Sequence, residues 1–130
     1  MSITIKRSID IEDVVRGALA PYMTAYCPPL PKTVALPSIE VEMVGGSNSD
    51  TIDRFDIVLD ARAEREYDAL ELMRNAIGIL KKVASDQTTA MHYCSENTKP
   101  VWIEDPTRPD VAMCRARLMI SAHEETATLE

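Results

Sequence analysis

The stretch that decides the fold runs from Phe55 to Ala84 and reads FDIVLDARAEREYDALELMRNAIGILKKVA. Up to Arg62, apolar Phe55, Ile57, Leu59 and Ala61 alternate with Asp56, Val58, Asp60 and Arg62, which predicts a strand with one buried face. From Ala63 to Ala84 the period becomes helical, and Lys81 and Lys82 fall late, as a helix dipole favours. The broad apolar face comprises Ala69, Leu70, Leu72, Met73, Ala76, Ile77, Leu80, Val83 and Ala84. This helix must therefore pack on the sheet that contains the strand.

A first helix is predicted upstream, from about residue 11 to residue 25. Asp10 can cap its N-terminus, and Glu12 and Asp13 place acidic groups in its first turn. An apolar stripe follows at helical spacing: Ile11, Val14, Val15, Ala18, Leu19, Tyr22 and Tyr26. We expect Pro21 to kink or divide this helix, because its ring clashes with the preceding turn and it has no N–H to donate.

The segment between the two helices predicts a stiff connector and a β hairpin. Four prolines between Cys27 and Pro37 forbid helix and favour extended backbone. Alternation from Ile39 to Val44 then predicts a strand. The following residues, from Gly45 to Asp50, tolerate turns, so the expected hairpin has a long, flexible loop before the strand that begins at Phe55.

The last third of the chain predicts two more strands. The polar stretch from Ser85 to Thr98 indicates no element, whereas 101–103 looks like a short strand and 105–110 a turn. In the final strand, 112–122, one side carries Cys114, Ala116, Leu118, Ile120 and Ala122, and the other Arg115, Arg117 and Ser121. The tail from Glu124 to Glu130 is expected to fray.

The whole order is helix, strand, strand, helix, strand, strand. It predicts a single α+β domain over residues 1–130, with an ordered core of about 8–122. Its sheet should be mostly antiparallel, with two helices packed on one face.

Composition narrows the class of protein. The chain has 130 residues, 45% of them hydrophobic and 27% charged, which fits one compact globular domain. It contains no stretch of roughly 20 apolar residues and no apolar leader at Met1–Ser8, so we expect it in the cytoplasm or in a particle assembled there. A net charge of −7 opposes binding to nucleic-acid backbones, but it suits a channel through which DNA slides.

Several residues could carry chemistry, but each also has an ordinary structural explanation. Gly45-Gly46-Ser47 could suggest a phosphate loop, but no Gly-Lys-Ser/Thr follows and a hairpin is favoured. His92 and Cys94 fall short of the four ligands of a zinc site, and a surface histidine and a core cysteine are favoured over a metal site or a Cys-His nucleophile. The other possible ligands have no diagnostic spacing: Cys27, Cys114 and His123. The three cysteines are interpreted as reduced, mostly buried thiols.

Two further candidate sites are a set of four carboxylates on and around the second strand and an isolated tryptophan. The carboxylates are Asp53, Asp56, Asp60 and Glu64, and we interpret Asp56 and Asp60 as solvated residues on the polar face of a strand. Trp102 could be a ligand platform, but anchoring a core edge or an oligomer interface is favoured. With no cofactor or metal site predicted, the interpretation is a structural protein and not an enzyme.

Several features in sequence order resemble the tail terminator proteins of siphophages, the lambda-like type found in phages of actinobacteria. These are the first helix, the proline-rich passage, a strand running into Val44-Gly45-Gly46, a strand ending at Ala63, and a small-residue helix. The most distinctive feature is Trp102-Ile103-Glu104-Asp105-Pro106 followed by a strand with Arg115. The resemblance covers roughly residues 8–122.

The resemblance implies a virion protein at the head-proximal end of the phage tail, assembled in the host cytoplasm. It implies a homohexameric ring that ends tail-tube polymerisation and offers a head-tail joining surface. Its partners would be itself, the major tail tube protein and the head-tail connector, with DNA passing through the ring without specific binding and with no membrane contact. The flexible 45–53 loop or an exposed strand could supply a ring contact that orders on assembly. The candidate interface residues are Gly45, Gly46, Ser47, Asn48, Trp102, Asp105, Arg108 and Arg115.

Other functions stay open at this point. A head-tail connector or stopper of the same phage neck shares small size and ring assembly, while a tail-tube subunit is disfavoured because such subunits need longer hairpins. A small cytoplasmic enzyme or metal-binding domain would use His92, Cys94 or the aspartates. A generic interaction module is the remaining alternative.

Overall fold

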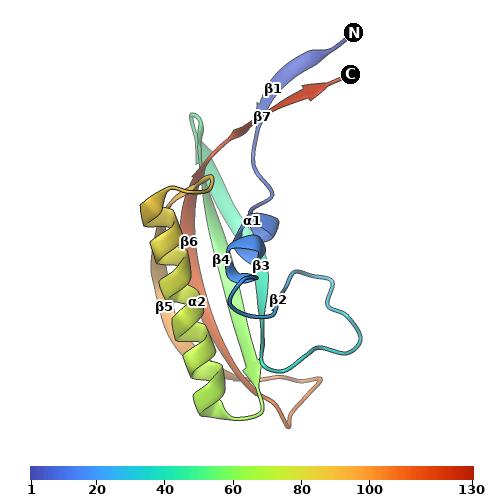
Figure 1. Ribbon diagram of the computed structural model, residues 1–130, viewed down its shortest axis with the longest axis vertical. Helices are drawn as coiled ribbons and strands as arrows, with labels where there is room; N and C mark the ends of the chain where they lie inside the picture. The colour runs from blue at the N-terminus through green and yellow to red at the C-terminus, as the bar shows by residue number, and fades with distance from the viewer.

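The computed structural model describes residues 1–130 as a sheet covered on one face by two helices, with a two-stranded ribbon projecting beyond one end (Figure 1). The elements are β1 Ile3–Arg7, α1 Ile11–Leu19, β2 Ala25–Tyr26, β3 Ser38–Ser49, β4 Ile52–Ala63, α2 Glu66–Asp86, β5 Met91–Glu104, β6 Ala112–His123 and β7 Glu125–Leu129. The predicted α+β class with two helices on a mostly antiparallel sheet is confirmed. Neither helix is long and apolar enough to span a bilayer.

The main sheet has five strands in the order β2-β3-β4-β6-β5. β4 lies at its centre, antiparallel to β3 and to β6, and β5 is the antiparallel edge strand beside β6. At the other edge the short β2 runs parallel to β3 and pairs only with Ile39 and Glu40. The outer edge of β3 beyond Glu40 therefore has no neighbouring strand.

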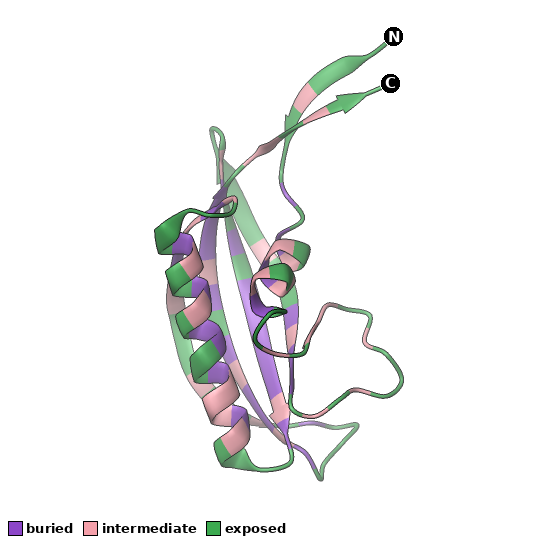
Figure 2. Cartoon of the chain, in the orientation of Figure 1, coloured by how far each residue is buried: buried purple, intermediate pink, exposed green.

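The core lies between the helices and one face of the sheet, as the alternation predicted (Figure 2). Inward residues of β4 and β6 are buried: Phe55, Ile57, Leu59, Ala61, Cys114, Ala116, Leu118, Ile120 and Ala122. The helices cover them with Val15 and Leu19 from α1 and with Met73 and Leu80 from α2. The opposite face of the sheet is left without a helix.

The first helix begins as predicted and ends early. The Asp10 side chain accepts a hydrogen bond from the backbone N–H of Asp13 at 3.3 Å. The helix stops at Leu19 and does not continue to residue 25. Ala20 still has helical backbone angles, but Pro21 has no N–H to continue the hydrogen-bond ladder and its ring clashes with the preceding turn, so the helix ends there.

Three segments differ from the sequence-based prediction. The expected loop at 45–53 is strand, because β3 extends to Ser49 and only Asp50 and Thr51 turn the hairpin. The polar stretch that indicated no element contributes residues 91–98 to β5. The tail does not fray: residues 125–129 form β7 and pair antiparallel with β1. In each case cross-strand pairing outweighs a composition rich in turn formers or polar residues.

Candidate assembly interface

The eight predicted interface residues do not form one surface. Gly45 to Asn48 pair with β4 near the tip of the β3–β4 hairpin, at one end of the sheet. Trp102, Asp105 and Arg108 lie at the other end, in β5 and in the turn that follows it. The structure therefore divides the predicted interface into a hairpin end and a turn end.

At the hairpin end the backbone is ordered and tightly constrained. Gly46 has φ +155°, and a Cβ there would lie 2.2 Å from the carbonyl oxygen of Arg54 on the partner strand. Only glycine fits this approach. The register shifts between Met43 and Gly45, and Met43 and Val44 are left 45% and 46% exposed. The prediction of a flexible loop that orders on assembly is therefore wrong, but the segment still forms an open strand edge.

The open edge of β3 is capped at one point by the first helix. The backbone N–H of Met43 donates to the Glu12 carboxylate at 2.8 Å, which holds α1 against the strand. Beyond this point the outer side of residues 44–49 faces no strand or helix of the chain. Unpaired strand edges of this kind can accept a strand from another chain.

The second open edge, β5, has a different character. Val101 and Trp102 are 49% and 48% exposed, so Trp102 does not anchor the core. The pairing of β5 with β6 shifts register between Met91 and Tyr93 and twice more between Glu96 and Val101, around Lys99 and Pro100. Bulges, lysine and proline are features that discourage strand addition. The edge keeps a regular register only over two short segments, residues 93–96 and residues 101–104.

Asp105 is a buried anchor and not a surface residue. Its exposed fraction is 4%, and its carboxylate accepts hydrogen bonds from Arg62 at 2.9 Å and from the N–H and hydroxyl of Thr107. Burial alone would raise the pKa of Asp105, but these donors lower it to about 2. Arg62 also binds Glu40 at 2.9 Å, so one guanidinium ties β3, β4 and the turn together.

Arg115 belongs to a second ion pair on the uncovered face of the sheet. Its guanidinium donates to both oxygens of Asp60, at 2.7 and 3.1 Å, and this bonding raises the pKa of Arg115. Asp60 is only 6% exposed, so the prediction of a solvated Asp60 is wrong, whereas Asp56 is exposed as predicted. Strand pairing across β4 and β6 places the arginine directly opposite the aspartate. Arg108 is exposed and lies 3.5 Å from Asp110.

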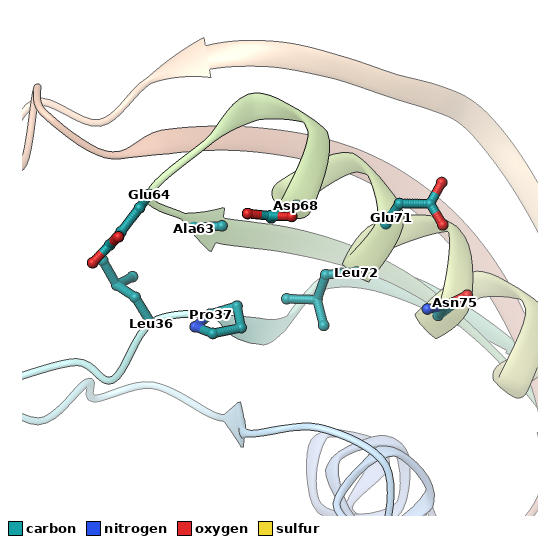
Figure 3. Close-up of a pocket in the computed structure, with 8 residues that line it drawn as sticks. All are labelled: Leu36, Pro37, Ala63, Glu64, Asp68, Glu71, Leu72 and Asn75. Atoms are coloured by element: carbon teal, nitrogen blue, oxygen red, sulfur yellow. The ribbon is translucent and has the colours of Figure 1, made fainter.

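The carboxylates singled out in the sequence do not converge. Asp53 is 3% exposed on the helix-covered side of β4, where one oxygen accepts from Asn48 at 2.8 Å and the other has no partner, whereas Asp60 lies on the opposite face. Glu64 lines a cavity of about 430 Å³ with Asp68 and Glu71, and the three carboxylates point in different directions (Figure 3).

The histidines and cysteines also lie apart. The ring of His92 stacks on that of His123 with centroids 4.6 Å apart, whereas Cys94 is buried in the core. Burial raises the pKa of both the Cys94 and the Cys114 thiol to about 11. Cys27 is half-buried, and its thiol donates to the backbone oxygen of Glu12. No three His, Cys, Asp or Glu side chains gather into a possible metal site.

Two possible interaction surfaces in the structure are not predicted from the sequence. One is the β1–β7 ribbon, for which the alternation of Ile3, Thr4, Ile5 and Lys6 was an available signal. The other is a groove of about 830 Å³ between the end of α1 and the outer side of α2. Neither follows from the pattern of one element alone, because each is made by two segments far apart in sequence.

No protein-family model matches this chain, and no curated protein gives a significant match to it.

Proposed function

We propose that this chain is a structural virion protein, the tail terminator of a long-tailed phage, which forms a ring on the head-proximal end of the tail tube and ends its polymerisation. The resemblance over residues 8–122 motivates the proposal, and the α+β fold is compatible with it. The observation that carries it is a single sheet with two unlike open edges, β3 beyond Glu40 and the whole of β5.

Unlike edges favour rings over two-fold dimers. A two-fold dimer joins a surface to an identical copy of itself, whereas a cyclic ring joins two different surfaces of each protomer. The open part of β3 carries the small residues Gly45, Gly46, Ser47 and Ser49, whereas the regular segment 101–104 of β5 carries Val101 and Trp102. A smooth edge and a bulky edge on opposite sides of one domain suit contacts of the second kind.

The charge of the chain suits the same role. With a net charge of −7, the protomers would surround DNA without holding it, since a grip on phosphates needs clustered Lys and Arg. In this proposal one side of the homohexameric ring meets the major tail tube protein and the other meets the head-tail connector. The protein is assembled in the host cytoplasm and stays in the virion.

The decisive test is electron microscopy of particles made after the gene is removed from its phage. Overlong tails separated from filled heads are expected, because the tube has lost its stop signal. Normal-length but unattached tails would instead identify a head-tail connector, and intact infectious particles would refute the proposal altogether.

Complementation with variant genes sharpens this test. Trp102→Lys places a charge on the β5 edge and should leave overlong tails, because the charge opposes the proposed ring contact. The protomer should still fold, since residue 102 is exposed and has no role in the core. Thr33→Lys is the control, since Thr33 is exposed in the connector between β2 and β3 and belongs to neither open edge, and this variant should restore normal tails.

A further inference from the structure

The β1–β7 ribbon is the least supported part of the fold. It consists of two strands of five residues each, and neither packs on a helix or on the main sheet (Figures 1 and 2). Isolated two-stranded ribbons are marginally stable in water and usually need a third strand or a helix against one face. The ribbon therefore lacks a covering surface within its own chain.

The ribbon has one face that such a surface would cover. Cross-strand pairs place Ile3 beside Leu129 and Ile5 beside Ala127 on this face, and Ile3 and Leu129 are 59% and 45% exposed. The opposite face is polar: Thr4 and Thr128 lie within hydrogen-bond distance, and Lys6 donates to the Thr126 hydroxyl at 2.7 Å. An amphipathic ribbon of about 17 Å in length is thus presented to a partner.

The groove between α1 and α2 has the complementary properties. Its apolar lining includes Met23, Leu72, Ile79 and Val83, which pack on the core from below and leave the groove open above. Gly78 also lines it, as an exposed glycine in the middle of a 21-residue helix. Glycine weakens a helix interior, and a Cβ at this position would meet nothing within 4 Å of its own chain. The missing side chain leaves room for an outside backbone to approach.

Charge also fits the ribbon to the groove. The groove is lined by Arg74, Lys82 and one carboxylate, Asp86, which gives a net positive charge in a chain whose net charge is −7. Arg74 pairs with Glu71 and Lys82 pairs with Asp86 within α2, but the two basic side chains remain 67% and 75% exposed. The ribbon carries Glu130 next to Leu129, and this carboxylate has no ion-pair partner in its own chain. The sheet edge of β5 is a poorer receptor, since Lys99 and Pro100 interrupt it.

We propose that the β1–β7 ribbon of one copy docks, apolar face inward, in the α1–α2 groove of a second copy of this chain. This inference rests on the proposed ring and names one of its contacts. Ribbon and groove are different surfaces, so each copy uses its ribbon on one neighbour and its groove on the other, and the contact propagates around a ring.

The test uses one variant for each side of the contact. Ile3→Lys with Leu129→Lys charges the apolar face of the ribbon at two exposed positions, and Gly78→Leu fills the groove. Neither should unfold the protomer: Gly78→Leu should raise Tm by about 2–5 °C, because leucine favours helix. Each variant alone should self-associate at least ~30-fold more weakly than wild type in sedimentation velocity, as expected for loss of a central contact.

Mixing the two variants gives the discriminating result. The lysine variant keeps its groove and the Gly78→Leu variant keeps its ribbon, so the mixture should form one-to-one dimers and nothing larger. Rings formed by either variant, no dimer in the mixture, or a wild-type chain that stays monomeric at ~100 µM, far above the Kd of a specific contact, would each overturn the proposal. The tail-length experiment decides the terminator function separately, because it does not depend on which surfaces make the ring.

Discussion

Asp105→Asn should lower the free energy of unfolding at pH 7 by about 2–3 kcal/mol. A fall of the Asp105 pKa from its ordinary 3.8 to about 2 corresponds to roughly 2 kcal/mol of stability at neutral pH. The side chain is only 5% exposed, so solvent screens its pair with Arg62 weakly. Asparagine keeps the shape but removes the charge, which leaves Arg62 with Glu40 as its only carboxylate.

The pH dependence separates charge from packing. The folded-state pKa is depressed, so the stabilisation is fully present well above pH 3.8 and is lost as the pH falls towards 2. At pH 3 roughly half of it should remain. Urea unfolding followed by circular dichroism should therefore give a midpoint about 1–2 M lower for Asp105→Asn at pH 7, with a clearly smaller difference at pH 3.

A matched control lies five residues further along the chain. Asp110 is 74% exposed and 3.5 Å from Arg108, so Asp110→Asn should change stability by less than about 0.5 kcal/mol at either pH. An Asp105→Asn loss equal at pH 7 and pH 3 would refute the electrostatic reasoning and would assign the effect to shape and hydrogen bonding alone.

Two further outcomes follow from the backbone and from burial. Gly46→Ala should lower the free energy of unfolding by about 1–3 kcal/mol, because the new Cβ would clash with a backbone oxygen of the partner strand. At Gly17 a Cβ would meet nothing within 4 Å, so Gly17→Ala should be neutral or stabilising by up to about 1 kcal/mol. Thermal unfolding of the two variants measures this difference. Cys94 and Cys114, whose thiol pKa values are about 11, should resist a thiol reagent at pH 8, whereas half-buried Cys27 should react first. Equal reaction rates for all three thiols in the folded protein would contradict the burial of Cys94 and Cys114.

The elements that could be predicted from sequence are those in which apolar residues repeat at one regular spacing. The strand from Phe55 and the strand ending near Ala122 each bury one face against helices, so alternation reports their burial directly. The long helix after Ala63 shows the helical period for the same reason. These three elements form most of the core and could be predicted without knowing the neighbours of any strand.

The rest depends on partners distant in sequence. Residues 45–49 resemble a loop in composition, yet they pair with residues 52–56 and so remain strand. The same holds for the candidate site. Asp105 and Asp60 lie in polar sequence that predicts exposure, but they are buried against arginines from β4 and β6. Composition cannot reveal a pairing that joins residues more than 40 positions apart, and the ribbon, which joins the two ends of the chain, is the extreme case.

An assembly subunit of the proposed kind must avoid indiscriminate association before it reaches the end of a tube. Edge strands are the usual hazard, because an unpaired edge accepts a strand from any similar chain. Here β5 is interrupted by Lys99, Pro100 and three shifts of register, which lowers the rate of indiscriminate strand addition. The face of the ribbon that carries Ile3 and Leu129 has only one charged pair, Arg7 with Glu125, and each strand is five residues long, so a single docked ribbon contributes a small contact. Small contacts gain strength when a ring closes, since the last protomer makes two at once and the effective concentration of its second contact is high. An interrupted β5 edge together with a short docking ribbon therefore favours closed rings over two-protein complexes. In the proposed function, this links the fold to assembly at the head-proximal end of the tail.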